Sequence, residues 1–218
     1  MNSDGSIEFE QISDMEHSLD QVKNKNVKIF TVDPPKNSLA QHICSALNWN
    51  LSDLHIVDFS NGECKPDIKE SVNGYDIYII STQNPQKSIN DNLMVTLITC
   101  DAFCNSGAKS INLIIPCYPY ARQDKKDSSR AAISARLVAQ MIEVAGVNRV
   151  FCLDLHNAAI QGFFSNKVPV DNIYAIYPVK EFLFKYVLKN KSYLGDHKKS
   201  EWADLFVAIS PDEGAYKR

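Results

Sequence analysis

Positively charged side chains are concentrated in one short stretch of the chain. Arg122, Lys125, Lys126 and Arg130 bring four cations together, although the formal net charge of the whole chain is −3. The stretch follows an apolar run and precedes a helical pattern, whose first backbone amides would add donors for an anion. This arrangement predicts a local site for a polyphosphate, and the alternative is a solvated charged loop. The interleaved aspartates and the negative net charge disfavour a nucleic-acid surface.

A carboxylate and an imidazole stand two positions apart, directly after the apolar run 149–153. The alternating side chains of a strand would turn Asp154 and His156 to one side and Leu155 to the other. Such a pair can bind a divalent cation or orient a general base. The alternative is a histidine that packs or forms a hydrogen bond at the end of a strand.

The elements that would position these residues alternate along the chain. We expect strands at 27–32, 54–59, 64–68, 76–81, 111–116, 149–153 and 205–209, and helices at 39–47 (capped by Ser38), 90–106, 129–145 and 178–188. Apolar strands that alternate with amphipathic helices predict the α/β class, with a parallel sheet and helices on both of its faces. The Asn61-Gly62 pair predicts a hairpin turn between the second and third strands.

Apolar spacing also indicates which helical residues face the core. We expect Leu93, Leu97, Ile98 and Cys104 to point inward from 90–106, and Ile133, Leu137, Val138, Met141 and Ile142 from 129–145. Ligands bind beyond the carboxyl ends of the strands in open α/β sheets. That rule marks 81–82, 116–120, 154–156 and 210–212 as candidate positions, and the last of these contains Asp212.

Length and composition exclude several classes of protein. At about 150 residues per domain, 218 residues amount to about one and a half domains. The chain is 44% hydrophobic, and none of its apolar runs approaches the ~20 residues of a membrane helix. Its acidic start has no apolar signal segment, and its six cysteines lack CxxC spacing. We therefore expect a reduced, intracellular protein with no membrane contact.

The motifs at these positions resemble those of the ribose-phosphate pyrophosphokinase family. The matching stretches are FSNGE (59–63), INDNLM (89–94), IIPCYPYARQDKKDSSRA (114–131), LDLHNAAIQGFF (153–164), VPVDNIYA (168–175) and SPDEGAYKR (210–218). The pair YARQDKK and DLHxxxIQGFF is highly specific, whereas a GxxxxGK[ST] loop and a GxGxxG after the first strand are absent. The resemblance implies a phosphoribosyltransferase-like domain in a ribose-phosphate diphosphokinase. Such an enzyme transfers pyrophosphate from ATP to ribose 5-phosphate, giving phosphoribosyl pyrophosphate and AMP.

The resemblance also implies roles for individual residues. It places Phe59, Asn61, Glu63, Arg122, Gln123, Asp124, Lys125, Asp127 and His156 at the ATP, with Lys126 continuing the motif. The hairpin residues of this set, 59–63, would complete the adenine pocket of a neighbouring subunit. That sharing implies a homo-oligomer, from dimer to hexamer. The implied cofactor is Mg²⁺, with Asp154, His156, Asp171 and Asp212 in the metal region.

Departures from the family pattern bear on what this chain can do. Ser165-Asn166-Lys167 replaces a metal-linked aspartate after GFF, and Asn73 stands where relatives often carry an arginine at an inhibitory phosphate site. The family's catalytic lysine loop and its ribose 5-phosphate loop would lie beyond Arg218. We therefore expect a truncated chain that is inactive alone, with its catalytic residues unassigned.

The expected organisation has three parts. A polar extension occupies 1–26, an ATP-side domain 27–170, and the incomplete start of a second, similar domain 171–218. The alternative function is a non-catalytic regulatory subunit of the same fold that associates with the synthetase. Either function is expected to be cytoplasmic.

Overall fold

The computed structural model describes residues 26–34, 38–183, 185 and 209. The chain divides into two units, Met1–Ile173 and Tyr174–Arg218. In the second unit the described helix is α5 (Ile176–Phe182), which begins two residues before the expected 178–188 helix. The segment 1–25, the expected strand at 205–209 apart from Ile209, and Asp212 lie outside the described residues. Among the helices that are described, none has the length and apolar character needed to cross a membrane.

The first unit is built on a five-stranded sheet in which all neighbouring strands are parallel. Its spatial order is β1 (Val27–Thr31), β4 (Asp76–Ile80), β5 (Ser110–Ile114), β6 (Arg149–Leu153) and β7 (Val170–Ile173). A separate antiparallel hairpin consists of β2 (Leu54–Asp58) and β3 (Cys64–Ile68). The predicted α/β class, parallel sheet and hairpin are confirmed. Because β7 pairs with β6, the expected domain boundary after residue 170 falls inside a strand of this sheet.

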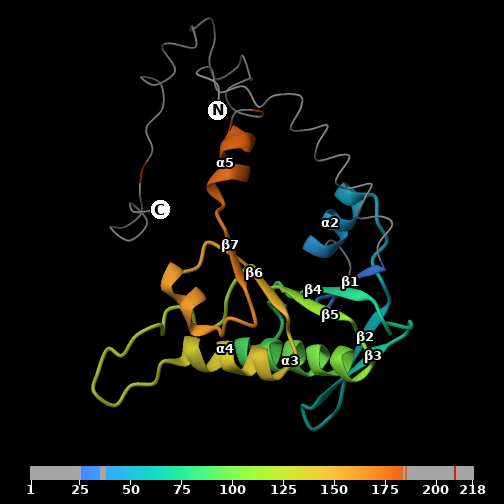
Figure 1. Cartoon of the computed structure of the whole chain (residues 1–218), viewed down its shortest axis with the longest axis horizontal. Helices are drawn as coiled ribbons and strands as arrows, with labels where there is room; N and C mark the ends of the chain where they lie inside the picture. Colours follow the sequence, from blue (N-terminus) through green and yellow to red (C-terminus); the bar gives the residue numbers. More distant parts are fainter. Residues whose placement is uncertain (1–25, 35–37, 184, 186–208, 210–218) are drawn as a thin grey trace, which may run out of the picture. The chain divides into compact units, whose positions relative to one another are not determined.

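Helices cover both faces of the sheet, as the sequence predicts (Figure 1). They are α2 (Leu39–Leu47) on one face, and α3 (Ile89–Asn105) and α4 (Ser134–Val144) on the other. Because side chains alternate along a strand, Ile80 packs with Cys44 of α2 whereas its neighbour Ile79 belongs to the larger core beside α3 and α4. Both faces of β4 are therefore buried, which explains its continuous apolar run.

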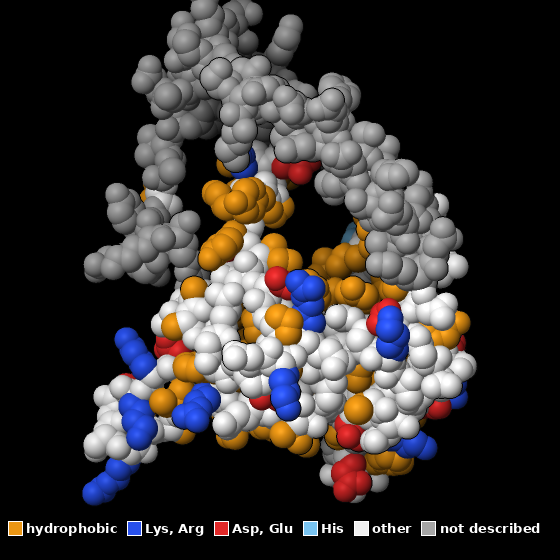
Figure 2. Space-filling view, viewed as in Figure 1, with side chains coloured by type: hydrophobic (Ala, Val, Ile, Leu, Met, Phe, Trp, Pro, Cys, Tyr) orange, Lys and Arg blue, Asp and Glu red, His pale blue; other side chains and the backbone are white. Residues whose placement is uncertain are grey.

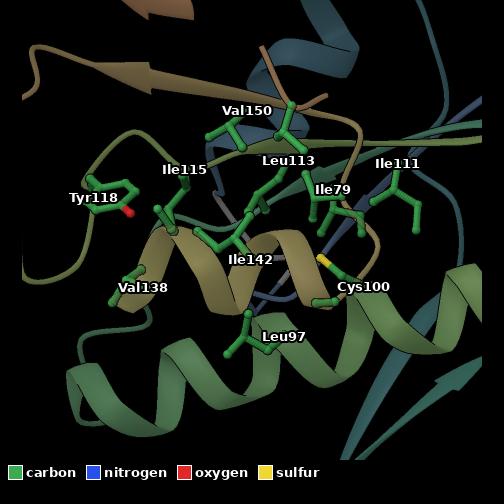
Figure 3. Packing of buried hydrophobic residues seen from close by; sticks show 14 of the residues in the cluster. Ile79, Leu97, Cys100, Ile111, Leu113, Ile115, Tyr118, Val138, Ile142 and Val150 are labelled. Atoms are coloured by element: carbon green, nitrogen blue, oxygen red, sulfur yellow. The ribbon is translucent and has the colours of Figure 1, made fainter. Parts of the chain in front are cut away.

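The larger core holds the sheet against α3 and α4 (Figure 3). Ile79, Leu113 and Ile115 come from the sheet side, and each is at most 1% exposed. They pack with Cys100 of α3 and Ile142 of α4, which are fully buried. Burial of one such aliphatic side chain contributes about 1.5–3 kcal/mol. This core anchors the strand ends from which the loops of the candidate site emerge.

Side chains at the helix ends explain where α2 and α3 begin and where α2 stops. Ser38 accepts a hydrogen bond from Gln41 N, and Ser88 forms a reciprocal capping box with Asp91 at the start of α3. Asn48, with a left-handed φ of 52°, ends α2. The expected cap at Ser38 and both expected helices are confirmed.

The start of α4 differs from the sequence prediction. The helix begins at Ser134, five residues after the expected start at Ser129, and the expected inward residue Leu137 is 57% exposed. Leu137 falls outside the stripe of α4 that faces the core, whereas its neighbour Val138 is 3% exposed. The buried face follows Ala135, Val138, Ala139 and Ile142. Small alanines thus occupy positions that a search for large apolar side chains passes over.

The inward position expected for Cys104 is also wrong. Cys104 is exposed, whereas Cys100 and Phe103 of the same helix are fully buried. The helical period of 3.6 residues carries the buried face from Leu93 through Cys100 to Phe103, and Cys104 falls at its edge.

The six cysteines should differ in reactivity according to their burial. Burial raises the pKa of the Cys100 and Cys152 thiols to about 12, so both stay protonated at neutral pH. Cys104 and Cys117 are exposed. We predict that only these two react quickly with a thiol reagent such as Ellman's reagent in the absence of denaturant. Substituting both with serine should remove the fast phase, and a fast phase that survives would contradict the packing described.

Candidate functional site

The loops that carry the expected site residues leave the carboxyl-terminal edge of the parallel sheet. They are 81–88 after β4, 115–133 after β5 and 154–157 after β6. Leu153 N donates to the Pro116 carbonyl oxygen at 3.2 Å, and Asp154 N donates to the Ile173 carbonyl oxygen at 2.9 Å. Three of the four expected strand-end positions therefore share one edge, and the fourth, 210–212, lies outside the described residues.

Buried polar side chains hold the first of these loops. Asp33 is only 8% exposed. Its carboxylate accepts hydrogen bonds from the backbone N and the hydroxyl of Thr82, each at 2.7 Å. Asn92 of α3 donates to the Asn84 carbonyl oxygen and accepts from Asn84 N, both at 3.0 Å. Because an unpaired buried polar group is costly, these bonds favour a single loop conformation.

Three non-glycine residues at this edge have a left-handed backbone. The φ angle is 67° at Gln83, 59° at Tyr120 and 45° at Asp154. Among the described residues the remaining case is Asn48, which ends α2. An L-residue in this conformation carries roughly 1–2 kcal/mol of strain. Strain of this kind concentrates at functional sites, where the surrounding structure maintains it.

The cationic loop is fixed to α3 and α4 by two of its side chains. The Tyr120 hydroxyl donates to Asn90 Oδ1 of α3. At Gln123, Oε1 accepts from Ser134 Oγ at 2.6 Å and the carbonyl oxygen accepts from Ala135 N at 3.2 Å. The loop itself thus uses one of the first amides of α4, which the sequence had suggested as donors for an anion.

A third anchor joins the cationic loop to the segment after β6. Asn157 Nδ2 donates to Asp124 Oδ2 at 2.6 Å. The two residues are 33 positions apart in the chain. The structure therefore brings the two expected motifs, residues 122–127 and 154–156, together at one edge. Sequence reasoning does not single out Asn157, because nothing in its local pattern indicates which loop it meets.

The four cations of the loop are solvent-accessible. Arg122, Lys125, Lys126 and Arg130 are all exposed. Within the part of the chain that the structure describes, none of the four forms an ion pair. Figure 2 shows Lys and Arg side chains gathered at the end of the molecule where Figure 1 places this loop. Positive charge that is held at a rigid edge and not neutralised by carboxylates suits an anion with several charges.

In the segment after β6, Leu155 points into the core whereas Asp154 and His156 do not, as the sequence predicts. Leu155 is 6% exposed and belongs to the core, and its backbone N donates to Asn172 Oδ1 at 3.0 Å. Asp154 is half-buried and His156 is exposed. The carboxylate and the imidazole are therefore both accessible to a ligand beside the cationic loop.

Asp171 lies apart from this pair. Asp171 of β7 stands opposite Phe151 of β6. Phe151 precedes Asp154 by three residues, a separation of about 10 Å along a strand. Asp171 Oδ2 accepts a hydrogen bond from Arg149 Nε at 2.6 Å, and this bond and the charge of Asp171 raise the pKa of the Arg149 guanidinium. In this structure Asp171 is thus engaged by a cation and is not brought to Asp154 and His156.

The residues at the edge fit one kind of metal ion. Among the described residues, no three His, Cys, Asp or Glu side chains group closely enough to hold a metal on their own. Mg²⁺ typically keeps several waters and binds through one or two carboxylates together with substrate phosphates. Asp154, half-buried next to a cationic loop, fits a magnesium ion that arrives with a polyphosphate.

The hairpin residues expected at the adenine lie elsewhere in the unit. The turn is closed by Phe59 N donating to the Glu63 carbonyl oxygen at 2.8 Å and by Glu63 N donating to Asn61 Oδ1 at 3.1 Å. Gly62 has a φ of 89°, and Phe59 is 47% exposed. The hairpin lies beside the loop that precedes α3, where Lys87 Nζ pairs with Asp58 Oδ1 at 2.5 Å, and Figure 1 shows its tip and the cationic loop as separate projections. One chain therefore does not bring Phe59, Asn61 and Glu63 to Arg122.

Comparison with known proteins gives a consistent result. Residues 27–146 match the model of the N-terminal domain of ribose phosphate pyrophosphokinase. Ribose-phosphate pyrophosphokinase A of Dictyostelium discoideum is 44% identical over 193 residues, which is 88% of this chain and 55% of the relative. The crystal structure of phosphoribosylpyrophosphate synthetase from Mycobacterium smegmatis has a TM-score of 0.68 and 37% identity, covering 74% of this chain and 53% of that one. The chain thus spans about half the length of these relatives.

The backbone at Asp154 allows a test of the strained edge. We predict that Asp154→Gly is more stable than Asp154→Ala by about 1 kcal/mol, because glycine adopts positive φ without a steric cost. At Asp127, whose φ is not left-handed, the alanine variant should be at least as stable as the glycine variant. Urea unfolding of the four variants measures both differences. An Asp154→Ala variant as stable as Asp154→Gly would contradict the strained geometry.

Proposed function

The chain belongs to the ribose-phosphate pyrophosphokinase family, and on that basis we propose that it supplies the ATP site of a ribose-phosphate diphosphokinase. The enzyme would transfer pyrophosphate from ATP to the anomeric hydroxyl of ribose 5-phosphate. One observation carries this proposal: four exposed cations without ion pairs are held at the strand ends beside Asp154 and His156. Both named relatives are enzymes, so a non-catalytic regulatory subunit is not favoured.

The proposed chemistry asks for positioning and charge neutralisation. The anomeric oxygen forms a bond to the β-phosphorus, the bond from that phosphorus to the α,β-bridging oxygen breaks, AMP leaves with that oxygen, and the hydroxyl proton passes to solvent. Arg122, Lys125 and Lys126 would offset the charge on the polyphosphate, since catalysis of phosphoryl transfer depends mainly on orientation and electrostatics. Gln123, whose Oε1 is held by Ser134, would orient its amide toward the nucleotide.

Magnesium is the proposed cofactor. When bound together with the nucleotide, Mg²⁺ would supply positive charge that offsets the charge of the polyphosphate. Asp154 and His156 would hold it at the sheet edge, and Asp124, Asp127 and Lys125 would complete the contacts around the ATP. Asp212 is a further proposed carboxylate of the metal region and lies outside the described residues. Asp171, which the resemblance also implies there, could join them only if its ion pair with Arg149 opened.

We also propose that the site is completed by a second copy of the chain. The tip residues Phe59, Asn61 and Glu63 are separated from the cationic loop within one unit (Figure 1), although each group is proposed to contact the same ATP. A homo-oligomer, from dimer to hexamer, would bring a tip from one subunit to the loop of another. The exposed ring of Phe59 is suited to stack on a base. The cytoplasmic location expected for this oligomer remains a prediction.

Removal of one cation tests the proposed ATP site. We predict that Arg122→Ala weakens magnesium-dependent ATP binding by at least about tenfold, because a charge-assisted hydrogen bond to phosphate is lost. Isothermal titration calorimetry with ATP, with and without Mg²⁺, measures the effect. Lys109→Ala is the matched control, since Lys109 pairs with Asp76 at the amino ends of β4 and β5. Equal binding by wild type and Arg122→Ala would remove the loop from the site.

Mixing two defective chains tests the shared site. Phe59→Ala and Arg122→Ala should each bind ATP weakly, but a reassociated equal mixture of two-fold dimers should regain about a quarter of the sites. The recovery arises because half of the dimers are mixed and each of these contains one intact site. A mixture of Arg122→Ala with Gln123→Ala should show no recovery, since both changes lie on one side of the interface. Without recovery in the first mixture, a site completed by a second subunit is wrong.

A further inference from the structure

One side chain connects the two loops of the proposed ATP site. Asn157 lies directly after the segment of Asp154 and His156, and its Nδ2 donates to Asp124 Oδ2 at 2.6 Å. The short distance is typical of a hydrogen bond to a carboxylate. Asp124 is itself part of the cationic loop. The bond therefore determines where the carboxylate of that loop is directed.

The orientation of the Asn157 amide is set by its other bonds. Its Oδ1 accepts from Ala159 N at 3.0 Å, as the N-cap of the 3-10 helix η1 (Ala158–Phe163). Its carbonyl oxygen accepts from Ile160 N at 3.1 Å, and Ile160 is fully buried. Exchanging the amide nitrogen and oxygen would lose the cap and the bond to Asp124 together. Asn157 is thus a fixed donor anchored to the core.

The surroundings of Asp124 show what this donor achieves. Arg122, Lys125 and Lys126 lie within two residues of Asp124, yet Asp124 forms no ion pair with any described residue. A free carboxylate in this position would be attracted to those cations and would compete with a phosphate for them. The Asn157 amide engages the carboxylate without adding charge. The cations of the loop consequently stay available to an anion.

We propose that Asn157 is a positioning residue, which holds the Asp124 carboxylate against the segment after β6 and so keeps Arg122 and its neighbouring lysines open to polyphosphate. This inference rests on the proposed function of the site. It assigns Asn157 no contact with the ligand. Its effect on binding acts entirely through Asp124.

The substitution Asn157→Ser separates the two bonds of the side chain. Serine is a good N-cap, so η1 keeps an acceptor while Asp124 loses its donor. We expect the Kd for MgATP to rise about three- to tenfold, which is the size of effect that the loss of one ordinary hydrogen bond produces, with little change in the melting temperature. Asn148→Ser is the matched control: Asn148 Oδ1 accepts from Ile111 N at 2.7 Å near the amino ends of β5 and β6. That change should lower the melting temperature and leave the Kd unchanged.

A double-mutant cycle with Asp124→Asn distinguishes positioning from a general structural role. If Asn157 acts through the Asp124 carboxylate, Asn157→Ser has no further effect on the Kd once Asp124 is neutral. Additive effects, or an unchanged Kd in Asn157→Ser, would overturn the inference while the proposed function stands. Failure of the wild-type chain to bind MgATP would overturn the proposed function, and the inference with it.

Discussion

The parallel arrangement of five strands is the constraint on which the rest of this structure depends. Parallel strands need crossover connections, and here the helices of those crossovers bury both faces of the sheet. The strands are consequently apolar on both sides and leave little room for polar chemistry between them. Their carboxyl ends meet at one edge, where Asp33, Thr82 and Asp154 take the place of aliphatic residues. Because both faces of the sheet are buried, this edge is where polar side chains of the strands and loops can reach a ligand.

The edge is held in shape by a small number of specific bonds. Tyr120 is bonded to α3, Gln123 to α4 and Asp124 to Asn157, so the cationic loop has fixed points before and within the stretch from Arg122 to Lys126. The positive side chains themselves extend to solvent. A site of this construction combines a positioned backbone with unneutralised charge, and both properties favour a ligand that brings several negative charges and a metal ion of its own.

Much of the fold could be predicted from sequence, because it depends on local pattern. The period of apolar residues identifies β1, β4, β5, α2 and α3 within one or two residues. The start of α4 could not be predicted in this way, since small alanines form its buried face and the preceding residues are held by turns. The position of Asp171 beside Arg149 depends on the register of β6 and β7, and the bond between Asn157 and Asp124 depends on how two distant loops meet. Local pattern contains neither kind of information.

Paramagnetic relaxation measures most directly whether this edge binds a metal-bound polyphosphate. Manganese would replace magnesium in a titration of the ¹⁵N-labelled chain with ATP, and the loss of amide signals would be mapped along the sequence. The account predicts that signals of 122–127 and 154–157 disappear first, and that they remain when manganese is added without ATP at the same concentration. Broadening centred on β2, β3 or α2, or no selective broadening with ATP, would contradict it.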